Sequence, residues 1–395
     1  MIRKIIRITL LLLLLFPILL WIFWLFESKR IINVLIFDKT VLNTKGVEHR
    51  SFNWVLNNMK VVKPDGDLYS IENDYFGFFP AEDFQYDIKD FSNMTSQDLD
   101  SLAEVYDMTY FTDTYGIYHN EWYRKGDDKE RSDIIYGGMQ TNEYEFLKKM
   151  IEKKKTVITE FSLYALPTPY NLRKKTEDLL RLKWTNWVGR YFSSLDTIKN
   201  KELPKWVSRL YKNQHGGKWP FRDGGIVYVN TNDQIVILDE KRHMEFPIPI
   251  IYTPKEFQEK YELPENIIYP FWFAVTLNGG NNNVISAFSV KSNPSGDSIL
   301  NYYRIPKNFV AAVEHITGDS NYYYFSADFC DNEMGMMSSK MNGIRNFRSL
   351  FYSQIELENR KRFFWEYYIP LIKNIVDDHE ARVGKNTIST WGFSN

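Results

Sequence analysis

Buried-strand patterns that alternate with amphipathic helices restrict this chain to a small set of folds. Residues 31–38 (IINVLIFD) form a continuous apolar run that ends in a carboxylate, which is typical of a strand covered on both faces. Apolar residues at helical spacing follow over 48–59. A second strand is predicted at 107–113, and a helix at 141–153 leads into a third strand at 156–161. Strands and helices in this order predict an α/β fold with a doubly wound, mostly parallel sheet.

The hydrophobic pattern changes to a period of two beyond residue 225. Turn residues separate strand-like runs at 225–229 and 234–238, and they do so again between 271–277 and 284–290. These two pairs of runs predict two β-hairpins.

The α/β pattern returns near the carboxyl terminus. Residues 322–329 predict another buried strand, and residues 362–376 predict a terminal helix with a kink at Pro370. The chain is therefore expected to consist of five segments: a membrane anchor (1–30), the first part of an α/β domain (31–224), a β-rich insertion (225–315), the last strand and helix of the α/β domain (316–380) and a tail (381–395).

The amino-terminal segment 8–26 (ITLLLLLLFPILLWIFWLF) carries no charged residue. Its length is close to the ~20 residues that a helix needs to cross a bilayer. Bulky aromatic residues lead directly into Glu27, without the small residues of a signal-peptidase site, so an uncleaved transmembrane helix is predicted and a cleaved signal peptide is the alternative. Basic residues are more numerous before the segment than after it. This bias predicts a single-pass membrane protein with an extracytoplasmic body, either periplasmic or at the cell surface.

The order of these elements, with Gly137-Gly138 before the helix at 141–153, resembles the class I glutamine amidotransferase-like fold. The resemblance covers residues 31–165 and 320–376. In that family a nucleophilic cysteine in a glycine-rich elbow follows the strand that corresponds to 156–161. This chain reads Glu160-Phe161-Ser162-Leu163 there, without cysteine or glycine. The resemblance therefore implies a degenerate member that shares the fold and lacks amidotransferase chemistry.

Composition excludes several classes of site. The single cysteine, Cys330, excludes an intrachain disulfide and a cysteine-based zinc cluster. The six histidines show no paired metal-ligand spacing, and no phosphate-binding glycine motif is present, so neither a metal nor a cofactor is predicted. The chain carries 49 basic and 50 acidic residues, and its basic excess is confined to the first 30 positions. A nucleic-acid partner is therefore not expected.

Acidic residues stand at the ends of four predicted strands. Asp38, Asp113 and Glu160 each end one strand, and Asp328 with Asp331 ends the last. Because ligands bind outside the carboxyl ends of parallel strands, these residues are expected to line one crevice. Such a cluster suits glycosidic acid–base catalysis, cation ligation or hydrogen bonding to sugar hydroxyls, and the spacing does not choose among them. The catalytic candidates are Asp113 and Glu160, with carboxyl groups expected about 5 to 10 Å apart. Asp38 and Asp328 are candidate ligand-binding residues. The alternative is that each acid caps a helix or binds a loop amide.

Two further candidate ligand-binding residues lie beside aromatic side chains. Tyr115 follows Asp113 on a loop, and Arg190 lies in the aromatic segment 184–192 (WTNWVGRYF). Aromatic rings next to a guanidinium suit sugar stacking and anion binding, although such residues also build ordinary cores. His49, just after Asp38 on the first helix, could face the crevice as an acid or base, and the favoured alternative is a solvated residue at the start of that helix.

These observations favour a membrane-anchored protein outside the cytoplasm that binds envelope carbohydrate, or assists an enzyme that acts on it. A carboxylate-dependent, glycoside-type hydrolase is the first alternative. A structural partner in a membrane complex is the second. The lipid bilayer, through residues 8–26, and an envelope glycan are the expected partners.

Overall fold

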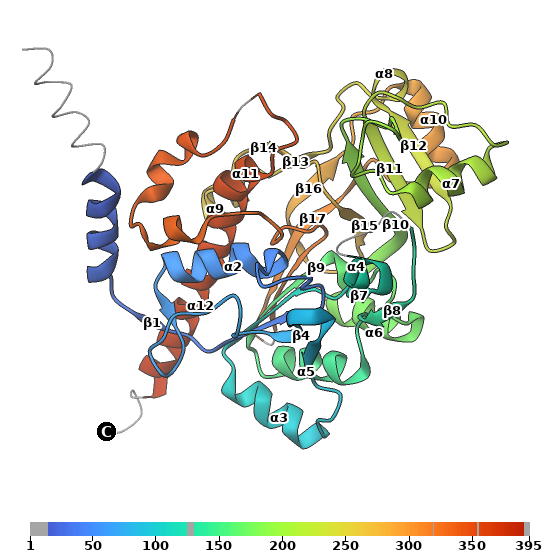
Figure 1. Ribbon diagram of the computed structural model, residues 1–395. Helices are drawn as coiled ribbons and strands as arrows, with labels where there is room; N and C mark the ends of the chain where they lie inside the picture. The colour runs from blue at the N-terminus through green and yellow to red at the C-terminus, as the bar shows by residue number, and fades with distance from the viewer. Residues whose placement is uncertain (1–14, 125–129, 319, 354, 391–395) are drawn as a thin grey trace, which may run out of the picture.

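The computed structural model describes residues 15–124, 130–318, 320–353 and 355–390. A ten-stranded sheet forms its centre (Figure 1). From one edge to the other, the strands are β14 (Asn266–Ile268), β13 (Ile250–Tyr252), β16 (Asn283–Ser289), β17 (Asn308–Ile316), β18 (Asn321–Phe325), β9 (Thr156–Glu160), β6 (Met108–Asp113), β2 (Val34–Asp38), β4 (Phe76–Pro80) and β5 (Tyr86–Lys89).

The predicted fold class, a mostly parallel doubly wound sheet with a transmembrane helix, is wrong in two respects. First, only the five neighbouring strands β18, β9, β6, β2 and β4 run parallel, while every other pairing in the sheet is antiparallel. β14, β13, β16 and β17 extend the same sheet antiparallel to one another, so the sheet is mixed. Second, no described helix could span a membrane, as shown below.

The parallel strands are covered by helices on both faces (Figure 1). Val34 and Ile36 of β2 point into a core with α2 (Val47–Asn58) and α12 (Ile369–Thr390), whereas Leu35 and Phe37 point into a core with α3 (Ser96–Val105) and α5 (Thr141–Glu152). Successive side chains of a strand face opposite sides, so an uninterrupted apolar run supplies both cores.

A second, four-stranded antiparallel sheet has the order β12 (Ile235–Asp239), β11 (Gly225–Asn230), β10 (Leu182–Phe192) and β15 (Phe273–Asn278). The hairpin predicted over 225–238 is confirmed as β11 and β12. The hairpin predicted over 271–290 is wrong, because β15 pairs with β10 while β16 pairs with β13 and β17 in the large sheet. The polar connection between β15 and β16 therefore joins the four-stranded sheet to the ten-stranded sheet.

The remaining elements are short strands and helices around these sheets. They are β1 (Arg30–Ile31), β3 (Val61–Val62), β7 (Ile117–Tyr118), β8 (Ile134–Tyr136), α4 (His119–Tyr123), α6 (Tyr170–Leu180), α7 (Lys205–Gln214), α8 (Glu240–His243), α9 (Lys255–Tyr261), α10 (Pro294–Tyr303) and α11 (Lys361–Phe363). A π-helical turn over Phe364–Tyr368 joins α11 to α12. It lies directly before Pro370, which cannot donate a backbone hydrogen bond within the helix.

The predicted membrane topology is corrected by the amino-terminal segment. Residues 15–26 form a helix, and residues 8–14 of the predicted span lie outside the described residues. No helix among the described residues is long and apolar enough to cross a membrane. The predicted transmembrane anchor, its lipid partner and the single-pass, extracytoplasmic localisation are therefore not supported.

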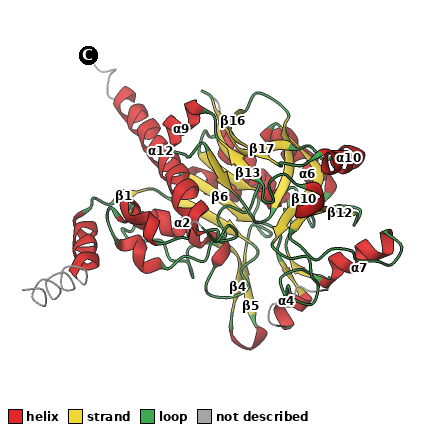
Figure 2. Cartoon of the chain, turned by 90° about the horizontal axis from the view of Figure 1, so that it is seen from above, coloured by secondary structure: helices red, strands yellow, loops and turns green. Residues whose placement is uncertain are grey.

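The carboxyl end of this helix is bound to the body by Lys60. The Lys60 ammonium donates to the backbone oxygens of Trp24, Leu25 and Glu27 at 3.2, 2.7 and 2.7 Å. The Trp24 indole in turn donates to the Asn57 oxygen at 2.9 Å. The last carbonyls of a helix have no partners within the helix, and a cation placed there also complements the helix dipole. Lys60 thus fixes residues 15–26 at one end of the molecule, opposite α7 (Figures 1 and 2).

Replacing Lys60 with methionine should loosen this helix. The substitution keeps most of the side-chain volume and removes all three donated hydrogen bonds. We expect amide hydrogen exchange of residues 15–26 to accelerate roughly tenfold to a hundredfold, since charged hydrogen bonds contribute about 1.5 to 3 kcal/mol. Exchange measured by mass spectrometry on the full chain tests this.

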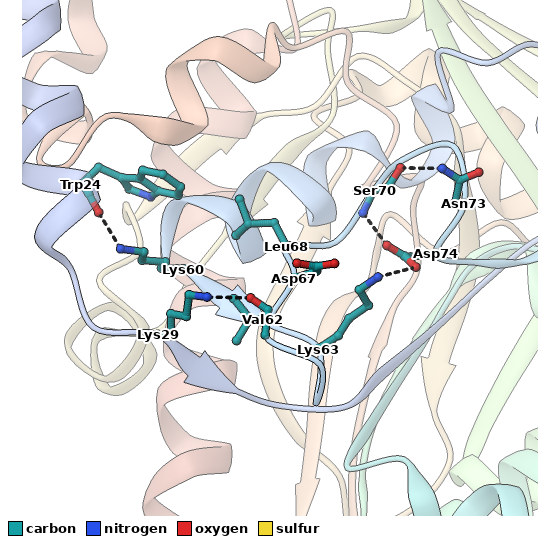
Figure 3. A pocket seen from close by; sticks show the side chains of 11 residues that line it. Trp24, Lys29, Lys60, Val62, Lys63, Asp67, Leu68, Ser70, Asn73 and Asp74 are labelled. Atoms are coloured by element: carbon teal, nitrogen blue, oxygen red, sulfur yellow. Dashed lines mark hydrogen bonds and ion pairs between the residues drawn. The ribbon is translucent and has the colours of Figure 1, made fainter.

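Lys63→Met is the matched control. Lys63 borders the same hollow beside the helix, but it pairs with Asp74 at 3.2 Å (Figure 3). Exchange of residues 15–26 should therefore stay unchanged in this variant. Equal acceleration in both variants would contradict the role assigned to Lys60.

Candidate functional site

Four neighbouring parallel strands bring carboxyl groups to one edge of the large sheet. Asp38 ends β2 and is the register partner of Asp113, which ends β6. Glu160 ends β9 opposite Phe325, the last residue of β18, and Asp328 follows three residues later. The strand order β18-β9-β6-β2 therefore sets these four acids side by side, as expected for the carboxyl ends of parallel strands. Their role in binding or catalysis stays a prediction.

Asp38 forms a buried pair with His49. Nδ1 of His49 lies 2.6 Å from Oδ2 of Asp38, and Nε2 lies 2.8 Å from the Ile71 oxygen. The Thr40 amide donates to the other Asp38 oxygen at 2.9 Å. Both ring nitrogens face acceptors, an arrangement that suits an imidazolium paired with a carboxylate. The prediction that His49 is solvated is wrong, because the loop that carries Ile71 covers it and the side chain is fully buried.

Asp113 has a pKa near neutral pH. Burial, followed by repulsion from Asp38, raises the pKa of Asp113 to about 7. The Tyr115 amide, which donates at 2.7 Å, and the hydroxyl groups of Ser162 and Thr40 oppose the shift. Asp113 is buried, with only 6% of its surface exposed.

Glu160 lies deeper than the other predicted site residues. Tyr110 donates its hydroxyl proton to one Glu160 oxygen, and the Phe329 amide donates to the other at 3.1 Å. Burial and the carboxyl group of Asp328 raise the pKa of Glu160 well above its usual range. Glu160 is fully buried. The hydrogen bond from Phe329 attaches the loop that follows β18 to strand β9. Glu160 therefore positions Asp328, which lies in this loop and reaches solvent.

Two further acids and an arginine belong to the same cluster. Burial and Asp38 raise the pKa of Glu48 well above its usual range. Burial and Asp331 raise that of Asp328, and Arg360 opposes this shift. The Arg360 guanidinium donates to the Asp331 backbone oxygen and lies 3.4 Å from Oδ2 of the same residue. Sequence reasoning placed Asp331 beside Asp328 at the end of the last strand, but it missed Glu48 and Arg360. Glu48 could have been proposed as a site residue because it is the neighbour of His49. Arg360 follows no predicted strand, and no sequence motif marks it as a site residue.

A buried ion pair between Lys39 and Glu143 lies next to the carboxyl cluster. Nζ of Lys39 lies 2.5 Å from Oε1 of Glu143, and both side chains are almost completely buried. Lys39 also donates to the Gly138 oxygen at 2.8 Å, and its backbone amide donates to the Asp113 oxygen at 2.8 Å. This pair ties β2, β6 and the start of α5 together directly beneath Asp38 and Asp113.

A polar hollow of about 670 Å³ adjoins the carboxyl cluster at Arg360. It is lined by Arg190, Lys201, Glu202, Phe271, Asn332, Glu333, Asn359, Arg360 and Lys361. Arg190 of β10 belongs to this hollow and pairs with Glu202 at 2.5 Å. Arg190 and Arg360 stack on the same ring, that of Phe271, and Arg360 in turn pairs with Asp331.

Tyr115 offers an aromatic face beside Asp113. Its side chain is 39% exposed, and its ring centroid lies 4.9 Å from that of Tyr118. Gly116 adopts a φ of +100°, and a Cβ atom there would lie 2.1 Å from the Tyr136 oxygen. Only glycine permits this approach to β8, so the loop holds the two tyrosines next to the carboxyl cluster.

Metal and thiol chemistry find little support in the described residues. Within them, no group of three or more histidine, cysteine, aspartate or glutamate side chains has an arrangement that could hold a metal ion. Cys330 is fully buried and accepts a hydrogen bond from the Tyr368 hydroxyl at 3.2 Å. Burial raises the pKa of the Cys330 thiol well above its usual range, which disfavours the nucleophilic thiolate.

Comparisons with known proteins assign no family. No protein-family model matches the chain, and no curated protein matches it. Among solved structures, it is similar to a ThuA-like protein from Bacteroides uniformis (10% identity, 80% of this chain, 91% of that chain, TM-score 0.32). It is also similar to a β-galactosidase from Bacillus circulans sp. alkalophilus (9% identity, 79% of this chain, 32% of that chain, TM-score 0.33). A third similar structure is an exo-β-1,4-mannosidase from Opitutaceae bacterium strain TAV5 (9% identity, 86% of this chain, 35% of that chain, TM-score 0.31). At these TM-scores the likenesses decide neither family nor activity.

The pKa of Asp113 predicts how stability depends on pH. In the native protein the pKa of Asp113 is about 7, against an ordinary value of 3.8 for an aspartate. Between these values the unfolded chain releases a proton that the native protein keeps, so stability falls as pH rises from about 4 to about 7. In Asp113→Asn, the decrease in the free energy of unfolding over this pH range should be smaller than in the wild type by up to about 4 kcal/mol. Urea unfolding at pH 5, 6, 7 and 8 measures it.

Asp87→Asn is the matched control, because Asp87 is exposed on β5, outside the carboxyl cluster. Its stability should follow that of the wild type at every pH. Parallel curves for the wild type and Asp113→Asn would show that Asp113 does not hold its proton near neutrality.

Proposed function

We propose that the carboxyl edge of the parallel strands binds carbohydrate, with Asp38, Asp113, Asp328 and Tyr115 facing the ligand or holding the groups that do. The observation that carries the proposal is the crowding of carboxyl groups on four adjacent strands. Their mutual repulsion and burial keep part of the cluster protonated at neutral pH.

A partly protonated cluster matches the chemistry of a sugar. A protonated carboxyl group donates one hydrogen bond and accepts others, whereas an ionised one only accepts. Sugar hydroxyls need donors and acceptors at short spacing, and Asp113 and Asp328 supply both kinds at the solvent boundary, where they are 6% and 7% exposed. An inorganic cation would instead need every carboxyl group ionised and arranged around one point.

The aromatic residues next to the cluster support the same ligand class. Tyr115 is exposed on the loop after β6, and its ring packs against that of the half-buried Tyr118 in β7. The apolar faces of sugar rings stack on such side chains, and the phenol hydroxyls hydrogen-bond at the ring edge. Carboxyl groups for the hydroxyls and aromatic faces for the ring thus lie together at the end of β6.

The proposal predicts binding of neutral sugars that depends on the carboxyl groups at the solvent boundary. Titration of the full chain with neutral mono- and oligosaccharides, followed by calorimetry and NMR, should give saturable binding. Asp328→Asn should weaken it about tenfold, equivalent to about 1.4 kcal/mol, because one hydrogen-bonding carboxyl group is lost. Asp87→Asn should bind as the wild type does. Absence of sugar binding, or equal binding by folded Asp328→Asn, would overturn the proposal.

A glycoside-type hydrolase is the second candidate, favoured by the pKa of Asp113 at about 7. A general acid or base works best when its pKa is near the operating pH. In this alternative Asp113 transfers the proton, while the buried Glu160 positions Asp328. The resemblance to the amidotransferase-like fold stays a hypothesis about ancestry and supplies no catalytic group.

Hydrolysis predicts a particular pH profile on chromogenic neutral glycosides. If Asp113 is the general acid, kcat/KM should fall as pH rises through about 7, and Asp113→Asn should abolish that limb while lowering the rate about a hundredfold or more. Activity that is unchanged in Asp113→Asn, with the variant folded, would exclude this role.

A further inference from the structure

The hollow beside the carboxyl cluster has the opposite electrostatic character. Four of its lining residues are cationic, Arg190, Lys201, Arg360 and Lys361, against the two acids Glu202 and Glu333. The carboxyl edge itself is acidic. A single side chain, Arg360, belongs to both regions, because it pairs with Asp331 and lines the hollow.

Two of these cations are held in fixed positions by one aromatic ring. The guanidinium carbon of Arg360 lies 3.6 Å from the centroid of Phe271, and that of Arg190 lies 4.5 Å from the same centroid. Stacking leaves the edges of each guanidinium directed sideways, where hydrogen-bond donors are presented. Planar guanidinium groups fixed in this way recognise carboxylates and phosphates by paired hydrogen bonds.

A buried amide at the border of the hollow has an unused acceptor. Asn332 is 2% exposed, and its Nδ2 donates to the Phe329 oxygen at 2.8 Å and to the Ser51 hydroxyl at 3.1 Å. A carbonyl oxygen only accepts, so this contact fixes the orientation of the amide. Oδ1 of Asn332 has no hydrogen-bond partner within the described part of the chain. A buried acceptor without a donor is costly, and a ligand hydroxyl would satisfy it.

We infer that the hollow is an anion subsite, so that the carbohydrate bound at the carboxyl edge carries a carboxylate or phosphate group. The anion lies against Arg360 and Arg190, with Lys201 and Lys361 at the rim, and a hydroxyl of the same ligand donates toward Asn332. The rest of the sugar extends past Arg360 to Asp328. This inference rests on the proposed function for the ligand class, while the anion site itself stands on the hollow.

The test compares three sugars of similar size on the full chain: glucose, sodium glucuronate and glucose 6-phosphate. Isothermal titration at two salt concentrations should show tighter binding of at least one anionic sugar than of glucose, and this advantage should shrink at high salt. Glucuronate and glucose 6-phosphate distinguish a carboxylate ligand from a phosphate ligand. Equal affinity for all three sugars would overturn the inference and leave the proposed carbohydrate function intact.

A charge-matched pair of double variants locates the effect. Lys201→Gln with Lys361→Gln removes two exposed cations from the hollow, and Lys199→Gln with Lys255→Gln removes two exposed cations that do not line it. The first should weaken anionic-sugar binding about fivefold and leave glucose binding unchanged, while the second should change neither. Equal loss in both double variants would mean that net charge, and not the hollow, attracts the anion.

Inorganic phosphate separates the two proposals if no sugar binds. Phosphate binding that disappears in the Lys201→Gln, Lys361→Gln variant would support the anion subsite while the carbohydrate function fails. Absence of phosphate binding together with absence of sugar binding would overturn both.

Discussion

Repulsion between carboxyl groups at one edge of the sheet is the constraint around which this molecule is arranged. Parallel strands necessarily end at the same edge, and Asp38, Asp113, Glu160 and Asp328 belong to four neighbouring strands or the loop directly after one. Charges of one sign cannot all be buried together. Part of the cluster therefore holds protons, and the remainder is paired with cations.

The compensating cations come from three different elements. His49 of α2 pairs with Asp38, Lys39 lies beneath the cluster in its pair with Glu143, and Arg360 approaches from the segment before the terminal helix. Each of these side chains also connects two parts of the fold, so the contacts that balance the charge of the carboxyl groups also hold the tertiary structure together. Because Arg360 also lines the neighbouring hollow, the acidic edge and the cationic hollow form one continuous surface.

Two strands of the parallel region, β6 and β9, could be predicted to within a residue, because a strand that is buried on both faces must be apolar throughout. The runs at 107–113 and 156–161 correspond to β6 and β9. The predicted run 31–38 begins three residues before β2, the run 322–329 ends four residues after β18, and β4 was not predicted. The error over 271–290 has a clear cause. Both runs are strands, but their partners lie up to about 90 residues away, and a turn-rich connection does not distinguish a hairpin from a crossing between sheets. The same long-range pairing made the large sheet mixed.

The sequence by itself determined that carboxyl groups stand at the ends of the central strands, since strand ends follow from local apolar patterns and the edge follows from parallel order. Only the tertiary structure decided which acids are buried, which reach solvent and which cations meet them. Arg360 and Asn332 lie far along the chain from the strands they serve, and neither follows a recognisable pattern. Proton sharing and ion pairing depend on distance and burial in space, and these quantities exist only once the chain has folded.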